Sequence, residues 1–214
     1  MTRGLFITFE GGEASGKSVQ AQALIAWLRA RDRTALLVHE PGSTPLGERV
    51  RDIVLHAKDV PLTPQAQALL FSTARAQLVH DVIAPALAAG TAVVADRFYH
   101  STLVYQGYVQ DADPRGLRAI TDFAVGETRP DRTFVLDVPV ATALERRAHE
   151  TGRPWDRFEA GKVDFHEKVR EGYLALARED PGHLIVVNGD RDQLAIEADI
   201  RRSMEELLGV PSRP

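Results

Sequence analysis

Short apolar runs and longer stretches of helical periodicity alternate along the chain. Each run consists mainly of Val, Leu, Ile, Phe and Ala residues, which is typical of strands that are buried on both faces of a sheet. The five runs that we predict as strands are Leu5–Phe9, Thr34–His39, Thr91–Ala95, Arg132–Leu136 and His183–Val187. Strands of this kind favour a parallel sheet that is covered by helices on both faces.

The stretches between these runs carry apolar residues three and four positions apart, the spacing of an amphipathic helix. The predicted helices are Val19–Ala30, Leu46–His56, Gln65–Ala89, a segment from Asp113 to near Gly126, Val140–Glu150, Val163–Arg178 and a last helix with Ile196, Ile200, Met204, Leu207 and Leu208 on its inner face. Pro85 is expected to kink or end the longest of them, and His100–Gly107 is predicted as a loop or short helix. The pattern predicts a single three-layer α/β domain over residues 1–210, with residues 211–214 fraying.

The composition narrows the cellular context. A chain of 214 residues, of which 44% are hydrophobic, is long enough for one full core. The net charge of −4 gives no general attraction to nucleic acid or acidic membranes, and no run approaches the ~20 apolar residues of a membrane span. The chain has no cysteine, its seven histidines lack metal-ligand spacing, and the first strand leaves no room for a signal peptide. We therefore expect a cytoplasmic protein that binds neither nucleic acid nor membrane.

The first predicted strand leads into the phosphate-binding motif GxxxxGK(S/T). Its residues, which we predict to bind a nucleoside triphosphate, are Gly11, Gly12, Glu13, Ala14, Ser15, Gly16, Lys17 and Ser18. Gly11 and Gly16 allow the backbone to wrap around an anion, so that N–H groups and a helix N-terminus point at phosphate oxygens. Lys17 brings positive charge to the β- and γ-phosphates, and the Ser18 hydroxyl can ligate Mg²⁺. In its strand–loop–helix context, the motif predicts a P-loop NTPase fold.

Charged residues also follow other predicted strands at their carboxyl ends, where ligands bind in parallel sheets. Asp96 closes the third strand and is a candidate for the magnesium site, while Asp137 closes the fourth strand and competes for that role. We favour Asp96 because Arg97 follows it, and a guanidinium fork matches phosphate oxygens. For either carboxylate the alternative is a structural hydrogen bond at the strand end.

Four arginines surround a segment with Gly and Pro that we predict as a lid loop over about residues 149–160. They are Arg146, Arg147, Arg153 and Arg157. A mobile loop that carries arginines can clamp a transferring phosphoryl group and exclude water. We assign catalytic roles to Arg153 and Arg157, whereas a solvated charged helix face is an equal alternative for Arg146 and Arg147.

Longer motifs resemble the thymidylate kinases (dTMP kinases) in order and spacing, from about residue 5 to about residue 190. The stretches that carry the resemblance are Phe9–Glu13, Glu40–Arg51, Leu70–Leu78, Asp96–Gly107, Asp156–Glu159 and Phe165–Leu174. Asp96–Gly107 is similar to the family signature DR(Y/F)xxS(S/T)xAYQG. The resemblance implies Mg²⁺-dependent transfer of phosphate from ATP to dTMP, giving dTDP and ADP. It also implies a homodimer, whose interface we expect on the helix Gln65–Ala89.

The same resemblance assigns the acceptor site residue by residue. Arg97 is expected to bind the acceptor phosphate with help from Arg49, and the ring of Phe71 to stack on thymine. Arg75 is expected at the edge of the base, and Tyr105 against the sugar. The implied substrate-binding set is Glu10, Pro41, Arg49, Phe71, Arg75, Arg97, Ser101, Thr102, Tyr105 and Gln106, and the implied catalytic set is Lys17, Arg97, Arg153, Arg157 and Glu13. Core packing is the alternative for Phe71 and Tyr105.

Two loop positions depart from the family pattern, because Ala14 and Ser43 stand where glycine is usual. Either residue must hold a right-handed conformation or accept strain, since side chains tolerate positive φ poorly. The phosphate loop has no arginine at its variable positions, which suggests the subclass whose catalytic arginine comes from the lid.

Other functions remain as alternatives. Another nucleoside or nucleotide kinase of the same fold would differ in its acceptor. A GTPase-like switch would require an Asn-Lys-x-Asp sequence, of which Asn188–Asp190 is the nearest fragment and lacks the Lys. Lys17 and Asp96–Arg97 argue against a catalytically inactive relative.

Overall fold

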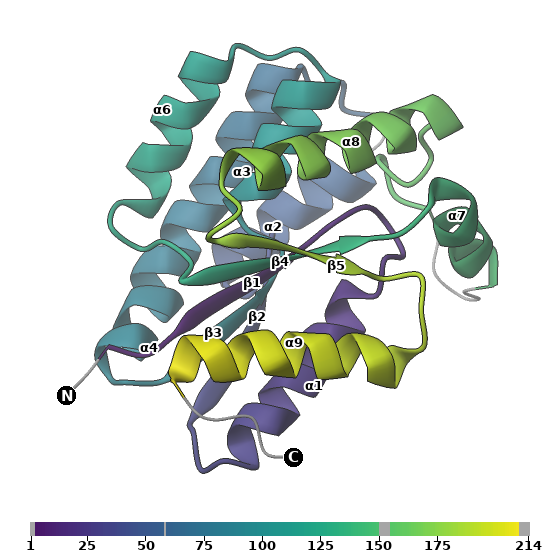
Figure 1. The fold of residues 1–214 in the computed structure, drawn as a ribbon. Helices are drawn as coiled ribbons and strands as arrows, with labels where there is room; N and C mark the ends of the chain where they lie inside the picture. Colours follow the sequence, from purple (N-terminus) through teal and green to yellow (C-terminus); the bar gives the residue numbers. More distant parts are fainter. Residues whose placement is uncertain (1–2, 58, 150–154, 210–214) are drawn as a thin grey trace.

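All five apolar runs form strands of one parallel sheet in the computed structural model, which describes residues 3–57, 59–149 and 155–209. The strands are β1 Phe6–Glu10, β2 Ala35–His39, β3 Ala92–Asp96, β4 Arg132–Asp137 and β5 Leu184–Asn188. Their order is β2-β3-β1-β4-β5, so that β1 lies at the centre of the sheet (Figure 1). The predicted five-stranded parallel sheet is confirmed.

Helices connect the strands as the periodicity predicted. They are α1 Lys17–Arg29, α2 Pro45–Arg51, α3 Pro64–Leu78, α4 Ala84–Ala88, α5 Tyr99–Thr102, α6 Pro114–Val125, α7 Val140–His149, α8 Val163–Glu179 and α9 Gln193–Leu208. Three wider π-helical turns extend them: η1 Asp52–His56, η2 Val79–Ile83 and η3 Leu103–Val109. The predicted helix Gln65–Ala89 is therefore α3, η2 and α4 in succession. Pro85 lacks the N–H that an α-helical ladder needs, and the wider turn η2 lies immediately before it.

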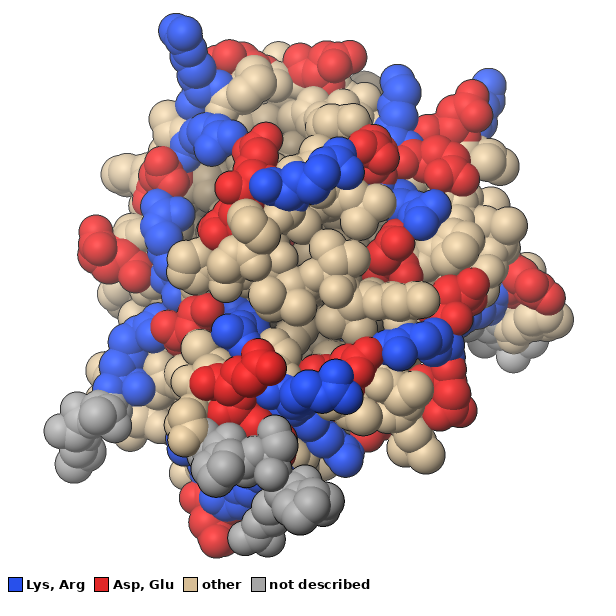
Figure 2. Space-filling model, in the orientation of Figure 1, with Lys and Arg blue, Asp and Glu red and all other residues tan. Residues whose placement is uncertain are grey.

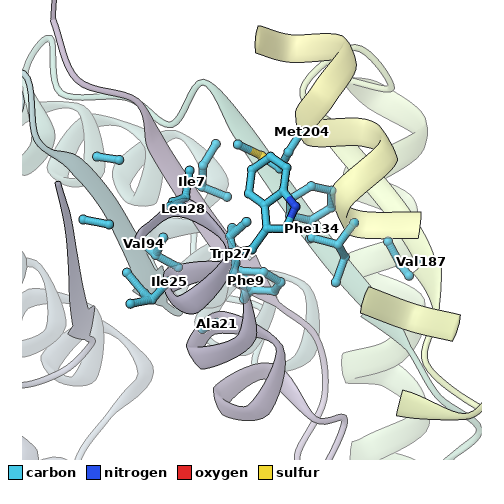
Figure 3. Packing of buried hydrophobic residues seen from close by; sticks show 14 of the residues in the cluster. Ile7, Phe9, Ala21, Ile25, Trp27, Leu28, Val94, Phe134, Val187 and Met204 are labelled. Atoms are coloured by element: carbon cyan, nitrogen blue, oxygen red, sulfur yellow. The ribbon is translucent and has the colours of Figure 1, made fainter. Parts of the chain in front are cut away.

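The two faces of the sheet have separate cores, because successive residues of each strand point to opposite sides. On one face, Ile7 and Phe9 of β1 pack against α1 and α9, with Trp27 and Met204 closing the cluster (Figure 3). On the other face, Phe6 packs among residues of η2, α4 and α6. A further cluster on this face joins α3, η3 and α8 to β4 and β5.

In Figure 2, side chains of both charges lie next to one another around a broad central area that has few charged residues, so neither sign dominates this face. Among the helices of the described residues, none has the length and apolar character that a membrane crossing requires. Because β1, β3 and β4 run parallel, their carboxyl ends lie together at one end of the sheet. The candidate residues lie at this end.

Candidate active site

The loop after β1 is folded as a cradle for an anion. Gly11 and Gly16 have φ values of +135° and +91°, which residues with side chains rarely adopt. A Cβ atom on Gly11 would also lie 2.6 Å from the carbonyl oxygen of Leu136 in β4. α1 begins at Lys17, so its first N–H groups have no partner within the helix and can bind phosphate oxygens. The geometry of the loop therefore fits the phosphate-binding motif.

Lys17 places its amine inside this cradle. Nζ donates hydrogen bonds to the carbonyl oxygen of Gly12 at 2.6 Å and to Oγ of Ser15 at 3.2 Å. Burial and the guanidinium of Arg97 lower the pKa of Lys17 to about 8, against the attraction of nearby carboxylates. A bound phosphate adds negative charge beside this amine, which raises its pKa and keeps the amine charged.

The two positions where glycine was expected both adopt left-handed backbone conformations. Ala14 has a φ of +49° and Ser43 a φ of +61°. Such a conformation costs a residue with a side chain about 1–2 kcal/mol. At Ser43, hydrogen bonds offset this cost: its N–H donates to Oε1 of Glu48 at 2.7 Å, and its Oγ accepts from the N–H of His39 at 2.9 Å. Ala14 therefore accepts strain, one of the two outcomes that the sequence left open.

A cavity of about 980 Å³ opens beside the loop at the carboxyl edge of the sheet. It is large enough for two nucleotides, since ligand sites commonly measure ~300–1,000 Å³. The predicted site residues that line it are Glu13, Ala14, Ser15, Gly16, Lys17, Ser18, Pro41, Phe71, Arg75, Asp96, Arg97, Ser101, Thr102, Tyr105 and Gln106. Gly11 and Gly12 line a smaller cavity of about 30 Å³ between the loop, α7 and α8.

Arg97 lines the large cavity and contacts both the loop and the helical segment α5–η3. Its Nη1 donates to the carbonyl oxygen of Gly11 at 3.0 Å, and its Nη2 donates to Oε1 of Glu13 at 2.8 Å. The hydroxyl of Tyr105 donates to the same carboxylate oxygen at 2.6 Å. Burial alone would raise the pKa of Glu13, but Arg97 and Lys17 lower it to about 2. The carboxylate is thus charged and holds Arg97 in the cavity.

The two candidate metal carboxylates have different partners. Asp96 accepts a hydrogen bond from the hydroxyl of Ser18 and lines the large cavity. Asp137 instead accepts two hydrogen bonds from Arg170 of α8, from Nε at 2.6 Å and from Nη2 at 3.0 Å. Its carboxylate therefore makes the structural contact that was the alternative for both residues. Asp96 with Ser18 offers a pair of oxygen donors of the type that Mg²⁺ prefers.

The opposite end of the cavity combines an aromatic ring with buried polar groups. Arg75 forms an ion pair with Glu40, with Nε 2.6 Å from Oε1, and its Nη2 donates to Oγ1 of Thr102 at 3.0 Å. Burial raises the pKa of Glu40 to about 7 despite this arginine. Phe71 lies beside Phe158, with 6.2 Å between the ring centroids. Phe71 and Tyr105 belong to a core cluster and also line the cavity, so core packing and ligand contact are compatible.

Arg49 does not reach the cavity, whereas Arg51 does. Arg49 is exposed and absent from the cavity lining, and Arg51 lines the cavity and donates from Nη1 to the carbonyl oxygen of Pro41 at 2.9 Å. Both residues belong to α2, and two positions on a helix point ~200° apart, so only one of them can face inward. The sequence alone does not separate the two arginines, because their orientation relative to the cavity is set by how α2 packs against α3.

The predicted lid arginines have distinct positions. Nη2 of Arg157 donates to the carbonyl oxygens of Ala57 at 2.6 Å and Val60 at 2.9 Å, and Arg157 does not line the cavity. Arg146 lines the cavity, while Arg147 is only 2% exposed and paired with Glu159. The alternative that Arg147 lies on a solvated helix face is therefore wrong, because its side chain is buried. Arg153, with the predicted lid residues 150–154, lies outside the described part of the chain.

Comparisons with known proteins agree on one family. The family model described as thymidylate kinase matches residues 9–200. The chain is 43% identical to the thymidylate kinase of Nitrobacter winogradskyi over 206 residues, which cover 95% of this chain and 89% of that protein. It is 41% identical to the thymidylate kinase of Roseiflexus sp. over 219 residues, covering 98% and 97% respectively. The crystal structure of thymidylate kinase from Ehrlichia chaffeensis superposes with a TM-score of 0.76 at 27% identity, covering 94% of this chain and 99% of that chain.

Proposed function

The chain belongs to the thymidylate kinase family, and we propose that its large cavity holds both substrates of the reaction at once. The enzyme transfers the γ-phosphoryl group of ATP to dTMP, giving dTDP and ADP. The loop Gly11–Ser18 binds the triphosphate, and Arg97 binds the phosphate of dTMP. The position of Arg97 carries this proposal, because its Nη1 lies 3.0 Å from the carbonyl oxygen of Gly11. Donor and acceptor phosphates therefore meet beside one guanidinium.

The chemistry that these residues supply is charge neutralisation and alignment. An oxygen of the dTMP phosphate attacks the γ-phosphorus, and ADP leaves with the electron pair of the broken P–O bond. Arg97 offsets the repulsion between the two phosphate groups, and Lys17 offsets the charge on the β- and γ-phosphates. Arg51 lies in the same cavity wall and is better placed than Arg49 to help at the acceptor phosphate.

The base of dTMP is assigned to the other end of the cavity. The ring of Phe71 offers a stacking surface, and Arg75, held by Glu40 and Thr102, presents polar hydrogens to a carbonyl of the base. Within the described residues, Nη1 of Arg75 is buried and has no hydrogen-bond partner, so an acceptor on the base would satisfy it. Gln106 is held nearby by Gln67, with 3.0 Å between Nε2 and Oε1.

The lid arginines complete the proposed site. Arg153 and Arg157 are assigned to the transferring phosphoryl group, as the family resemblance implies. Because Arg157 is held by the carbonyl oxygens of Ala57 and Val60, a contact with phosphate requires it to exchange these two hydrogen bonds. The turn around Arg157 would have to move for this contact to form.

We expect dTMP to stimulate ADP release in the presence of ATP and Mg²⁺ far more than other nucleoside monophosphates do. A site that hydrogen-bonds one base leaves buried polar groups unpaired with another, which lowers kcat/KM by about 10²-fold or more. The measurement is coupled ADP release against dTMP, dCMP, dGMP and AMP. Equal stimulation by dTMP and any of the other three would contradict the assignment of the base site.

Mg²⁺ is assigned to Ser18 and Asp96, whose hydroxyl and carboxylate oxygens fit the preference of this ion. When bound, Mg²⁺ would neutralise charge on the phosphates of ATP. Asp96→Asn is therefore expected to raise the Mg²⁺ concentration needed for half-maximal activity by about tenfold, because the charge of one ligand is lost. Asp137→Asn is the matched control, since it removes a carboxylate that pairs with Arg170 instead. Titration of the activity of both variants with Mg²⁺ provides the measurement. If only Asp137→Asn changed the Mg²⁺ requirement, the metal site would be assigned to Asp137 instead.

The face formed by α3 and α6 is proposed as the interface of a homodimer. Phe123 of α6 is 93% exposed and Leu69 of α3 is 55% exposed, and burying such apolar side chains favours association. Phe123→Glu is expected to convert a dimer into a monomer of 23.5 kDa in light scattering after gel filtration. Leu194→Glu, on α9 and 70% exposed, is the control that should stay dimeric. Dissociation by Leu194→Glu instead would place the interface on α9.

A further inference from the structure

We infer that Tyr173 is a positioning residue for Arg97, acting from α8 without contacting the substrate. The inference rests on the proposed role of Arg97 at the acceptor phosphate. Tyr173 is 1% exposed and lines only the small cavity behind the loop. Its hydroxyl nevertheless lies 3.2 Å from Nη1 of Arg97, a side chain that lines the large cavity.

Glu10 is the partner through which Tyr173 is held. This carboxylate is fully buried at the end of β1 and receives hydrogen bonds from three groups. They are the N–H of Phe98 at 2.8 Å, the hydroxyl of Ser101 at 2.7 Å and the hydroxyl of Tyr173 at 2.9 Å. Glu10 lines neither of these two cavities, but it binds Ser101, which lines the large one. The structure shows contacts of Glu10 with neighbouring protein groups, and the substrate contact that the resemblance implies stays a prediction.

The hydroxyl of Tyr173 links this carboxylate to Arg97. Burial raises the pKa of Tyr173 well above its usual range, so the hydroxyl keeps its proton. That proton is donated to Glu10, and the lone pairs of the oxygen accept from Nη1 of Arg97. Buried chains of this kind, from cation to hydroxyl to carboxylate, restrict the orientation of each member.

Arg97 needs such support because its backbone is strained. Its φ is +70°, a left-handed value that a residue with a side chain adopts only when its surroundings enforce it. Glu10 binds the N–H of Phe98, the next residue, and through Tyr173 it also restrains the side chain of Arg97. One carboxylate thus fixes both the backbone and the guanidinium. Tyr173→Phe would remove one hydrogen bond from the guanidinium, which keeps its bonds to Gly11 and Glu13, and would leave the backbone contact in place.

The test is the binding of dTMP and of thymidine, measured by calorimetry in the full-length protein and its Tyr173→Phe variant. Thymidine has the same base and sugar but no phosphate, so it does not report on Arg97. We expect the Kd of dTMP to rise about tenfold, the scale of one hydrogen bond to a charged group, and the Kd of thymidine to change less than twofold. Tyr108→Phe is the matched control, because Tyr108 is 48% exposed, and it should alter neither Kd.

A double-mutant cycle separates positioning from a general effect on the fold. In an Arg97→Ala background, Tyr173→Phe should cause no further loss of dTMP affinity, because it acts through the guanidinium. An equal loss of thymidine and dTMP affinity, an additive loss in the cycle, or an unchanged Kd of dTMP in Tyr173→Phe would each overturn the inference. If Arg97→Ala itself leaves dTMP binding unchanged, the proposed role of Arg97 fails instead.

Discussion

Arg97→Ala is expected to lower kcat/KM for dTMP by about 10³-fold, because it removes the guanidinium that we assign to the acceptor phosphate beside the phosphate loop. The melting temperature should fall by only a few degrees. The polar partners of Arg97 remain satisfied in part, since the carboxylate of Glu13 keeps its hydrogen bond from Tyr105. Steady-state kinetics and thermal unfolding of the same preparation provide the measurement.

The control for this substitution is Arg49→Ala. Arg49 is exposed and outside the cavity lining, so its loss should change kcat/KM for dTMP by less than about twofold. A loss at Arg49 as large as that at Arg97 would restore the assignment implied by the family resemblance. A large drop in melting temperature for Arg97→Ala, with its activity loss explained by unfolding, would make Arg97 a structural residue.

Lys17→Ala is expected to reduce kcat/KM for ATP by about 10³-fold while leaving the affinity for dTMP nearly unchanged. The amine is the charged side chain of the phosphate loop that faces the cradle, where it binds Gly12 and Ser15. Removing it leaves developing charge on the β- and γ-phosphates without a cation at this position. Steady-state kinetics at varied ATP concentration report on the ATP-binding part of the site, and calorimetry of dTMP binding reports on the acceptor part.

Lys168→Ala is the matched control for Lys17, because Lys168 lies exposed on α8 outside the cavity. It should retain the kcat/KM of the unchanged enzyme for ATP. If Lys17→Ala weakened dTMP binding as strongly as it weakens ATP use, the loop would have collapsed and its division into donor and acceptor parts would be wrong.

Properties that depend on local sequence were predictable. Continuous apolar runs defined the central strands β1, β3 and β4 because they are buried on both faces, whereas the edge strands β2 and β5 are partly exposed. The glycine spacing defined the loop because its turns require positive φ. The convergence of Asp96 and Arg97 with the loop followed from the geometry of parallel sheets. The left-handed conformation of Ala14 was foreseen only as one of two outcomes, because its φ depends on the whole turn.

Properties that depend on the direction of a side chain were not predictable. Arg49 and Arg51 differ only in helical phase, and the phase of α2 is set by how it packs against α3. Asp137 differs from Asp96 because Arg170, which reaches it from α8, pairs with its carboxylate. The hydrogen bond between Glu10 and Tyr173 joins residues 163 positions apart in the sequence. No local pattern contains such pairings.

Glu13 has a consequence for how the two substrates influence each other. It occupies a position of the donor loop, yet its carboxylate forms the ion pair that holds the acceptor arginine. If the loop rearranges around ATP, the free energy of the ion pair between Glu13 and Arg97 changes, and with it the affinity of Arg97 for the phosphate of dTMP. Thermodynamic linkage makes such an effect mutual: the factor by which ATP alters dTMP affinity equals the factor by which dTMP alters ATP affinity. We therefore expect the Glu13–Arg97 ion pair to make the affinities for the two substrates depend on each other.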